Sequence, residues 1–263
     1  MCGVAGYSLS PQSRVARTLA AQALLAAIAE RGADAVGYAY RLEGEGQVHG
    51  EKRRTAASAL LDEVSIPGEA TQALVHVRDY TKGHPSIAAN NHPVRHGAVV
   101  GIHNGIIVND DELFAEHGFE RATPEMTVDS EAIFALAEAV PASAAPLEEL
   151  RGSMATAWLD ERRPDTIFLA RGVNRPLWVG YGKDAAFFAS TRRALEIVEQ
   201  YTRVGLRKHE VEEGRLIALR DGREAWSERF RPNRDFEERV LPAVRAPDEG
   251  ASCLQRLAAL AAA

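Results

Sequence analysis

The spacing of apolar residues changes along the chain, and each spacing predicts a different element. Residues 3–9 form a short, largely apolar run of strand length. Residues 14–31 instead place apolar side chains such as Leu24 and Ile28 one helical turn apart, and Gly32 follows where glycine commonly ends a helix. The chain is therefore expected to open with a strand followed by a helix.

Apolar and alternating segments recur through the rest of the chain. The run at 97–102 is rich in β-branched residues, and the Asn104-Gly105 pair after it favours a two-residue hairpin turn before the apolar pattern resumes. Helices are expected at 110–117 and 130–140. The other expected strands lie at 36–42, 71–77, 154–160, 165–171, 176–180, 186–190, 204–210 and 214–219.

The order of these elements indicates the fold class. Strands that do not alternate regularly with helices argue against a parallel doubly wound sheet and favour antiparallel sheets with helices packed outside. We therefore expect an α+β sandwich. Residues 1–232 form the main domain in this interpretation, whereas 233–263 mix charge, proline and glycine before an Ala/Leu helix and either lie on the domain or bind a partner.

Composition limits the kinds of partner. The 263 residues are 46% hydrophobic and 26% charged with a formal net charge of −6, so neither disorder nor a nucleic-acid partner is expected. The basic run 52–54 (Lys-Arg-Arg) is interpreted as a solvated turn. No segment has the ~18 apolar residues of a membrane span or the pattern of a signal peptide. We therefore expect a cytoplasmic protein with no membrane partner and no disulfide between Cys2 and Cys253.

Cys2 is the first residue that points to chemistry. Removal of Met1 would leave it at the start of the chain with a free α-amine. An α-amine titrates at about pKa 7.7–8.0 and can accept the proton of the thiol beside it, so one residue can supply both nucleophile and base. A cysteine at position 2 is weak evidence alone, because the reactivity of a thiol depends on its surroundings.

Four further segments follow Cys2 in a specific order. They are 31–37 (Arg-Gly-Ala-Asp-Ala-Val-Gly), 76–83 (His-Val-Arg-Asp-Tyr-Thr-Lys-Gly), 102–107 (Ile-His-Asn-Gly-Ile-Ile) and 127–131 (Thr-Val-Asp-Ser-Glu). Together they resemble the glutaminase domain of class II glutamine amidotransferases, which are N-terminal-nucleophile hydrolases, and most closely the glucosamine-6-phosphate synthase branch. The resemblance extends over most of the chain and implies a four-layer αββα sandwich of antiparallel sheets.

The resemblance makes Cys2 the nucleophile that attacks the side-chain amide of L-glutamine, forming a thioester and releasing ammonia. Attack creates an oxyanion, and a preset hydrogen-bond donor at that position can lower the barrier by ~3 kcal/mol. The resemblance assigns the donors to the Asn104 side-chain amide and the Gly105 N–H. A tight turn is the alternative interpretation of these two residues, and the two interpretations are compatible.

Glutamine also carries an α-carboxylate and an α-ammonium. By resemblance Arg78 binds the carboxylate, because a planar guanidinium can donate two parallel hydrogen bonds to it. Asp129 would bind the ammonium, and Thr81 would add a hydroxyl contact. Taken alone, Arg78 is equally well interpreted as an exposed surface residue, and Asp129 as the N-cap of a helix that begins near Ser130.

Four more residues are expected to shape the site without transferring protons. Arg31 and Asp34 belong to the first of the segments, which is otherwise a helix end and a turn, and His76 and His103 flank the site motifs as hydrogen-bonding residues. The histidines and cysteines show no spacing typical of a metal site, so no metal is expected. The resemblance implies no cofactor.

The resemblance breaks in the loop after Arg78. Related sequences continue with an aromatic residue and then Ala-Thr-His-Gly, whereas here Asp79, Tyr80 and Lys82 surround Thr81. These substitutions fall where the related loop closes over glutamine. Relatives also continue into an acceptor domain, so the sequence leads us to expect a separate synthase or synthetase subunit that receives the ammonia, with an oligomer as a further possibility.

Two other functions stay open from the sequence. One is an N-terminal-nucleophile amidohydrolase that acts on another small amide. The other is a catalytically silent module that binds glutamine or regulates a partner, in which Asp79 and Lys82 mark the loss of the loop. The joint presence of Cys2, Arg78 and Asn104 argues against the silent module.

Overall fold

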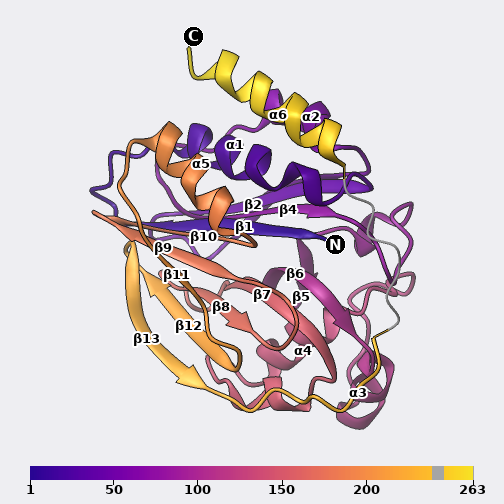
Figure 1. Cartoon of the computed structure of the whole chain (residues 1–263). Coiled ribbons are helices and arrows are strands. Elements are labelled where there is room, and N and C mark those ends of the chain that lie inside the picture. The colour runs from indigo at the N-terminus through magenta and orange to yellow at the C-terminus, as the bar shows by residue number, and fades with distance from the viewer. Residues whose placement is uncertain (239–245, 263) are drawn as a thin grey trace.

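The computed structural model describes residues 1–238 and 246–262, and the chain folds into four layers (Figure 1). Two β-sheets face each other in the middle. Helices α1 (Arg17–Ile28) and α5 (Arg192–Thr202) cover the outer face of one sheet, and α4 (Glu131–Ala139) covers the outer face of the other. The predicted α+β sandwich, with layers in the order αββα, is confirmed.

Both sheets are antiparallel, with strand orders β11-β9-β10-β1-β4-β2-β3 and β13-β12-β8-β7-β6-β5. The first sheet consists of β1 (Gly3–Leu9), β2 (Ala35–Leu42), β3 (His49–Arg53), β4 (Ala70–Arg78), β9 (Trp178–Gly182), β10 (Ala185–Ala189) and β11 (Arg207–Glu210). The second consists of β5 (Val94–His96), β6 (Val99–Ile107), β7 (Gly152–Asp160), β8 (Ile167–Arg171), β12 (Arg215–Arg220) and β13 (Arg223–Arg229).

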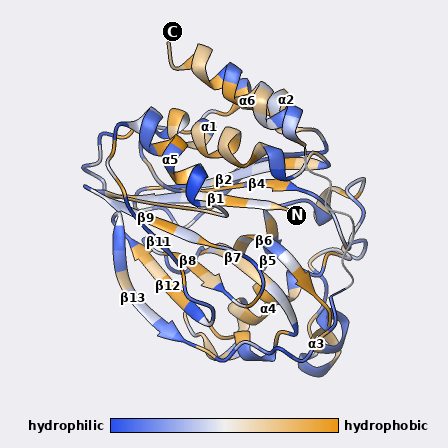
Figure 2. Ribbon diagram, viewed as in Figure 1, coloured by the Kyte–Doolittle hydropathy of each residue, from blue (hydrophilic) through white to orange (hydrophobic). Residues whose placement is uncertain are grey.

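Three apolar clusters hold the layers together, and they explain why the chain stacks in this order. Leu24 of α1 and Phe187 of β10 belong to the cluster outside the first sheet. Phe188 points the other way and joins the cluster between the sheets, as expected from the alternation of side chains along a strand. Phe134 of α4 belongs to the third cluster, outside the second sheet. Figure 2 shows apolar residues in the strands of both sheets and in the helices that cover them.

Helix α6 (Pro247–Leu260) lies across α1 on the side away from the sheet (Figure 1). Cys253 and Leu257 of α6 are fully buried in the same cluster as α1, and the Ala246 N–H donates to the Glu30 carbonyl at 2.9 Å. Helix α1 is therefore covered on two sides, which explains why its apolar residues occupy most of its circumference rather than one stripe. The remaining helices are α2 (Ala57–Leu60) and α3 (Asp110–His117).

The prediction of a hairpin turn at Asn104-Gly105 is wrong. Both residues lie inside β6, which runs without interruption and pairs them with Ala155 and Met154 of β7. The turn that leads into β6 is formed instead by Gly97 and Ala98, since His96 pairs with Val99 and Gly97 has a φ of 55°. The turn preference of an Asn-Gly pair is thus overridden by pairing with a distant strand.

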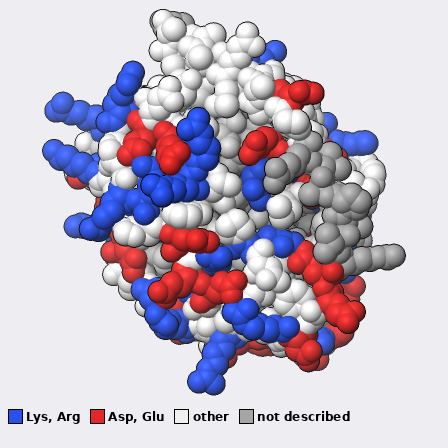
Figure 3. All heavy atoms as spheres, in the orientation of Figure 1, with Lys and Arg blue, Asp and Glu red and all other residues white. Residues whose placement is uncertain are grey.

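The prediction that residues 52–54 form a solvated turn is wrong for Lys52. This residue lies in β3, and its Nζ donates to the carbonyls of Asn91 at 2.7 Å and Pro93 at 3.0 Å. Burial lowers the pKa of Lys52 to about 8. Basic side chains (Lys and Arg) and acidic side chains both occur across the face shown in Figure 3. Within residues 1–238 and 246–262, no helix has the length and apolar character needed to cross a bilayer.

Candidate active site

The strand pairing of the first sheet brings the start of the chain to the end of β4. Gly3 pairs with Val77, so Cys2 lies beside Arg78 and Asp79. The Cys2 Sγ is 3.4 Å from the Asp79 carbonyl oxygen, to which it donates a hydrogen bond. Burial raises the pKa of the Cys2 thiol, and the nearby Arg78 guanidinium opposes that rise. A base close to the sulfur is therefore needed to form a thiolate near neutral pH.

Arg31 and Asp34 hold the backbone around Cys2. The Arg31 Nε donates to the Cys2 carbonyl at 2.9 Å. The Asp34 N–H donates to the Arg78 carbonyl at 3.0 Å, and its carboxylate accepts the N–H of Tyr80 at 2.9 Å. The two residues that the sequence predicts to shape the site are therefore brought to the ends of β1 and β4.

Arg78 is buried, with 2% of its surface exposed, so the surface interpretation of this residue is wrong. Its NH1 donates to Asn91 Oδ1 at 2.6 Å, and its NH2 donates to the carbonyls of Lys82 at 2.9 Å and of Gly83. Burial lowers the pKa of Arg78, while the charges of Cys2 and Asp129 oppose this. Asn91, which the sequence analysis does not identify, therefore orients the guanidinium.

Asn104 projects from β6 into the interior, with 1% of its surface exposed. Its Nδ2 is buried and has no hydrogen-bond partner among residues 1–238 and 246–262. An unpaired buried donor costs about 1–3 kcal/mol, so a ligand that supplies an acceptor would recover that cost. Such a donor is suited to an oxyanion.

Gly105 follows Asn104 in a conformation that a side chain would not tolerate. Its φ is 151°, and a Cβ there would lie 1.9 Å from the Ser153 carbonyl oxygen of β7. Glycine is therefore required by close strand approach rather than by a turn. The backbone of β6 can adopt this conformation while staying paired along its length.

Asp129 lies just before α4, and its Oδ2 accepts the N–H of Ile107 at 2.7 Å. This bond ties the segment 127–131 to the end of β6. The N-cap of α4 is Ser130, so the N-cap interpretation of Asp129 is wrong. Burial raises the pKa of the Asp129 carboxyl to about 6. A bound cation would stabilise its charged form.

Two predicted histidines lie behind these groups. The His76 Nε2 and the His103 carbonyl oxygen are 3.0 Å apart, and the His103 Nδ1 is 2.9 Å from Ser130 Oγ. Burial lowers the pKa of both imidazoles to about 3, so each is neutral at pH 7. The ring of His92, which the sequence analysis does not identify, stacks on His76 with centroids 4.2 Å apart. Thr81, in contrast, is exposed in the loop after β4.

Comparison with known proteins identifies the family of this chain. Residues 77–197 match the model of a family described as a glutamine amidotransferase domain. The glutamine–fructose-6-phosphate aminotransferase (isomerizing) of Shouchella clausii is 30% identical over 217 residues, which are 78% of this chain and 34% of that enzyme. Its Chlamydia pneumoniae counterpart is 33% identical over 204 residues, which are 74% of this chain and 32% of that enzyme.

The chain contains a class II glutamine amidotransferase domain. The amidotransferase domain spans about a third of the length of the curated relatives that it matches. Solved structures support the N-terminal-nucleophile hydrolase fold. The glutamine phosphoribosylpyrophosphate amidotransferase from B. subtilis has a TM-score of 0.67 at 22% identity and covers 88% of this chain and 50% of its own. A glutamine aminotransferase class-II domain protein from Silicibacter pomeroyi has a TM-score of 0.56 at 17% identity, covering 88% and 100%.

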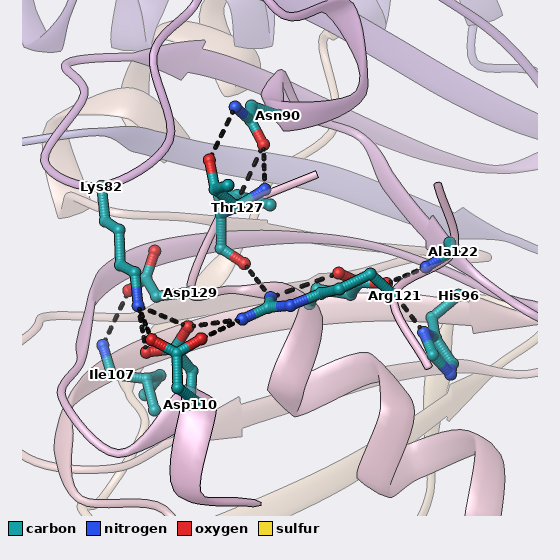
Figure 4. Close-up of polar contacts among 12 residues, drawn as sticks. Lys82, Asn90, His96, Ile107, Asp110, Arg121, Ala122, Thr127 and Asp129 are labelled. Carbon is teal, nitrogen blue, oxygen red and sulfur yellow. Dashed lines mark hydrogen bonds and ion pairs between the residues drawn. The ribbon is translucent and has the colours of Figure 1, made fainter. Parts of the chain in front are cut away.

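The unusual loop of the amidotransferase domain is fastened by an ionic network (Figure 4). The Lys82 Nζ lies 2.7 Å from Asp110 Oδ1 and 2.9 Å from Asp111 Oδ2, at the start of α3. The Arg121 guanidinium bridges the same two carboxylates and also reaches Glu131 at 3.3 Å. Figure 4 shows Lys82 and Asp110 beside Asp129.

This ionic network was not found from the sequence of the amidotransferase domain. Asp110 and Asp111 look like the acidic first turn of a helix, which is a common local feature. Arg121 lies in an irregular segment, so nothing in its neighbourhood marks it. Within the described part of the chain, no three His, Cys, Asp or Glu residues are placed to hold a metal ion.

Proposed function

We propose that this domain hydrolyses the side-chain amide of L-glutamine through Cys2, giving glutamate and ammonia, and that the ammonia passes to an acceptor synthase or synthetase. The observation that carries the proposal is the buried Asn104 amide nitrogen without a partner among the described residues. It lies on the strand that carries Gly105 and ends at the Asp129 contact. Family membership and this unsatisfied donor point to the same reaction.

The proposed chemistry begins with removal of Met1. The freed α-amine of Cys2 takes the thiol proton, and the thiolate attacks the amide carbon of glutamine. The negative charge on the amide oxygen is met by the Asn104 side chain and the Gly105 N–H. The amine then returns its proton to the leaving nitrogen, and ammonia departs from a glutamyl thioester. Water, deprotonated by the same amine, hydrolyses the thioester and regenerates the thiol.

Each charged group of glutamine is proposed to bind a side chain of the opposite charge. Arg78 would bind the α-carboxylate and Asp129 the α-ammonium. The NH2 of Arg78 is engaged by loop carbonyls, so a bidentate carboxylate must displace at least one of them. Glutamine binding is therefore coupled to movement of residues 79–83. The neutral His76 and His103 would support this arrangement without exchanging protons.

The proposal is tested with protein whose N-terminus has been checked by mass spectrometry. Chains lacking Met1 are expected to release glutamate and ammonia from glutamine. Cys2→Ala should reduce the rate by about 10³-fold or more, because loss of a nucleophile leaves only the residual effect of the binding site. Full turnover by a chain that keeps Met1, or by the Cys2→Ala variant, contradicts the mechanism.

The same assay separates the alternative functions. An amidohydrolase with another substrate would release ammonia faster from asparagine or another small amide than from glutamine. A silent module would bind glutamine in calorimetry without releasing ammonia. We place the reaction in the cytoplasm, where the free thiols of Cys2 and Cys253 stay reduced.

A further inference from the structure

Asp79 makes contacts on both sides of Cys2. Its backbone carbonyl accepts the Cys2 thiol at 3.4 Å, and its carboxylate forms an ion pair with the α-ammonium of Met1. The backbone nitrogen of Cys2 lies between the thiol and Met1 along the chain. Once Met1 is removed, the Cys2 nitrogen becomes the terminal amine. It is one residue along the chain from the Met1 ammonium that the Asp79 carboxylate pairs with in this structure.

The other charged groups around the start of the chain have different partners. Arg31 donates to the Cys2 carbonyl, and Arg78 donates to Asn91 and to loop carbonyls. The Asp34 carboxylate accepts the N–H of Tyr80. Among the described residues, the ion pair formed by Asp79 is with the start of the chain. Its side chain is only 13% exposed, so solvent screens it little.

We propose that Asp79 is a positioning residue that pairs with the α-amine of processed Cys2 and directs that amine at the thiol. The inference rests on the proposed function. When the proton moves from the sulfur to the amine, the products are a thiolate and an ammonium, and the Asp79 carboxylate stabilises the ammonium. Proton transfer is thereby favoured, although burial and, to a smaller extent, the Asp79 charge itself raise the pKa of the Cys2 thiol.

The test compares Asp79→Asn with the unchanged protein, using only chains shown by mass spectrometry to lack Met1. An opposite charge within a few ångströms shifts a titration by about 1–3 pH units. The acid limb of kcat/KM for glutamine should therefore move about one unit to lower pH in the variant. The maximal kcat should fall about tenfold, following the weaker base. Asp79→Glu should restore the original limb.

A second measurement does not depend on turnover. The rate at which iodoacetamide alkylates Cys2 at pH 7 reports its thiolate, and it should fall about tenfold in Asp79→Asn. Cys2→Ala gives the background from Cys253. Asp62→Asn is the matched control, because Asp62 also pairs with a cation, Arg256, at 2.8 Å, and its alkylation profile should not change.

The outcomes separate this inference from the proposed function. An active unchanged protein with the same acid limb and alkylation rate in Asp79→Asn overturns the role of Asp79 alone. An inactive unchanged protein whose alkylation still depends on Asp79 contradicts glutamine hydrolysis but supports the pairing. If Asp79→Asn does not fold, Asp79→Ser is measured instead, and an unchanged alkylation rate in it overturns the inference.

Discussion

The two sides of the site are held in place by different means. On the strand side, Asn104 and Gly105 are fixed by the continuous ladder between β6 and β7. On the loop side, residues 79–83 are held by ion pairs at both ends and by their own carbonyls resting on Arg78. A ladder of backbone bonds gives one geometry, whereas ion pairs can break and re-form. We infer that the two proposed oxyanion donors are fixed and that the proposed substrate entrance is adjustable.

The largest loss of activity is expected on the strand side, where Asn104→Ala should lower kcat. Loss of one oxyanion donor typically costs about 10²–10³ in kcat, or roughly 3–4 kcal/mol. The unfolding temperature should not fall, because the Asn104 Nδ2 has no partner to lose within the described chain. Steady-state glutamate release and thermal melts test both parts. A variant that melts much earlier but keeps its kcat would mean that Asn104 is structural.

A smaller effect, on the free energy of unfolding, is expected from the titration of Asp129. Its pKa in the folded protein is about 6, above the ordinary 3.8, so the folded state binds this proton more tightly than the unfolded chain. The contribution to stability is complete below about pH 4 and is lost as pH rises through 6, with an upper limit of about 3 kcal/mol. Urea denaturation of the ligand-free protein from pH 7 to 4 measures it.

Asp129→Asn serves as the comparison, because an amide does not titrate. The part of the pH dependence that comes from Asp129 should vanish in this variant. The unchanged protein should also show a rising KM for glutamine below pH 6, since protonation removes the charge that we propose binds the ammonium. A KM that stays flat between pH 7 and 5 would argue against ammonium binding at Asp129.

The smallest effect is expected on the loop side, from Lys82→Met. The Lys82 side chain is 38% exposed, and partly exposed ion pairs contribute roughly 1 kcal/mol or less. We expect KM for glutamine to change less than about tenfold, with a weaker dependence on salt than in the unchanged protein. Lys183→Met, at an exposed lysine outside the site, is the control. A loss of kcat comparable to that of Asn104→Ala would remove the distinction between the two sides.

Local sequence was enough to predict what local interactions decide. The helix at 110–117 and the strand at 3–9 have the bounds expected from their patterns. The prediction of a turn at Asn104-Gly105 was wrong because pairing with Ala155 and Met154 of a distant strand overrides a dipeptide preference. Helix α5 was missed, although Thr191 caps it by accepting the N–H of Ala194 at 3.1 Å.

Sequence motifs mark some residues of the candidate site, whereas residues that contact it from distant segments are not marked. Cys2, Arg78 and Asp129 lie in recognisable segments. Asn91 and Arg121 act through contacts that only folding creates, with Arg78 and with Asp110 respectively. A short stretch of sequence does not show which side chains will meet after folding.

Helix α1 lies between the first sheet and α6, so it cannot be fully packed during synthesis until α6 has been made. A ribosome makes the first helix long before residues 246–262, so one apolar face of α1 stays open to water or chaperones in the meantime. Gly250 packs against Glu30, the neighbour of Arg31, whose guanidinium holds the Cys2 carbonyl. The end of α1, next to the residue that holds the Cys2 carbonyl, is therefore covered only after α6 has been made.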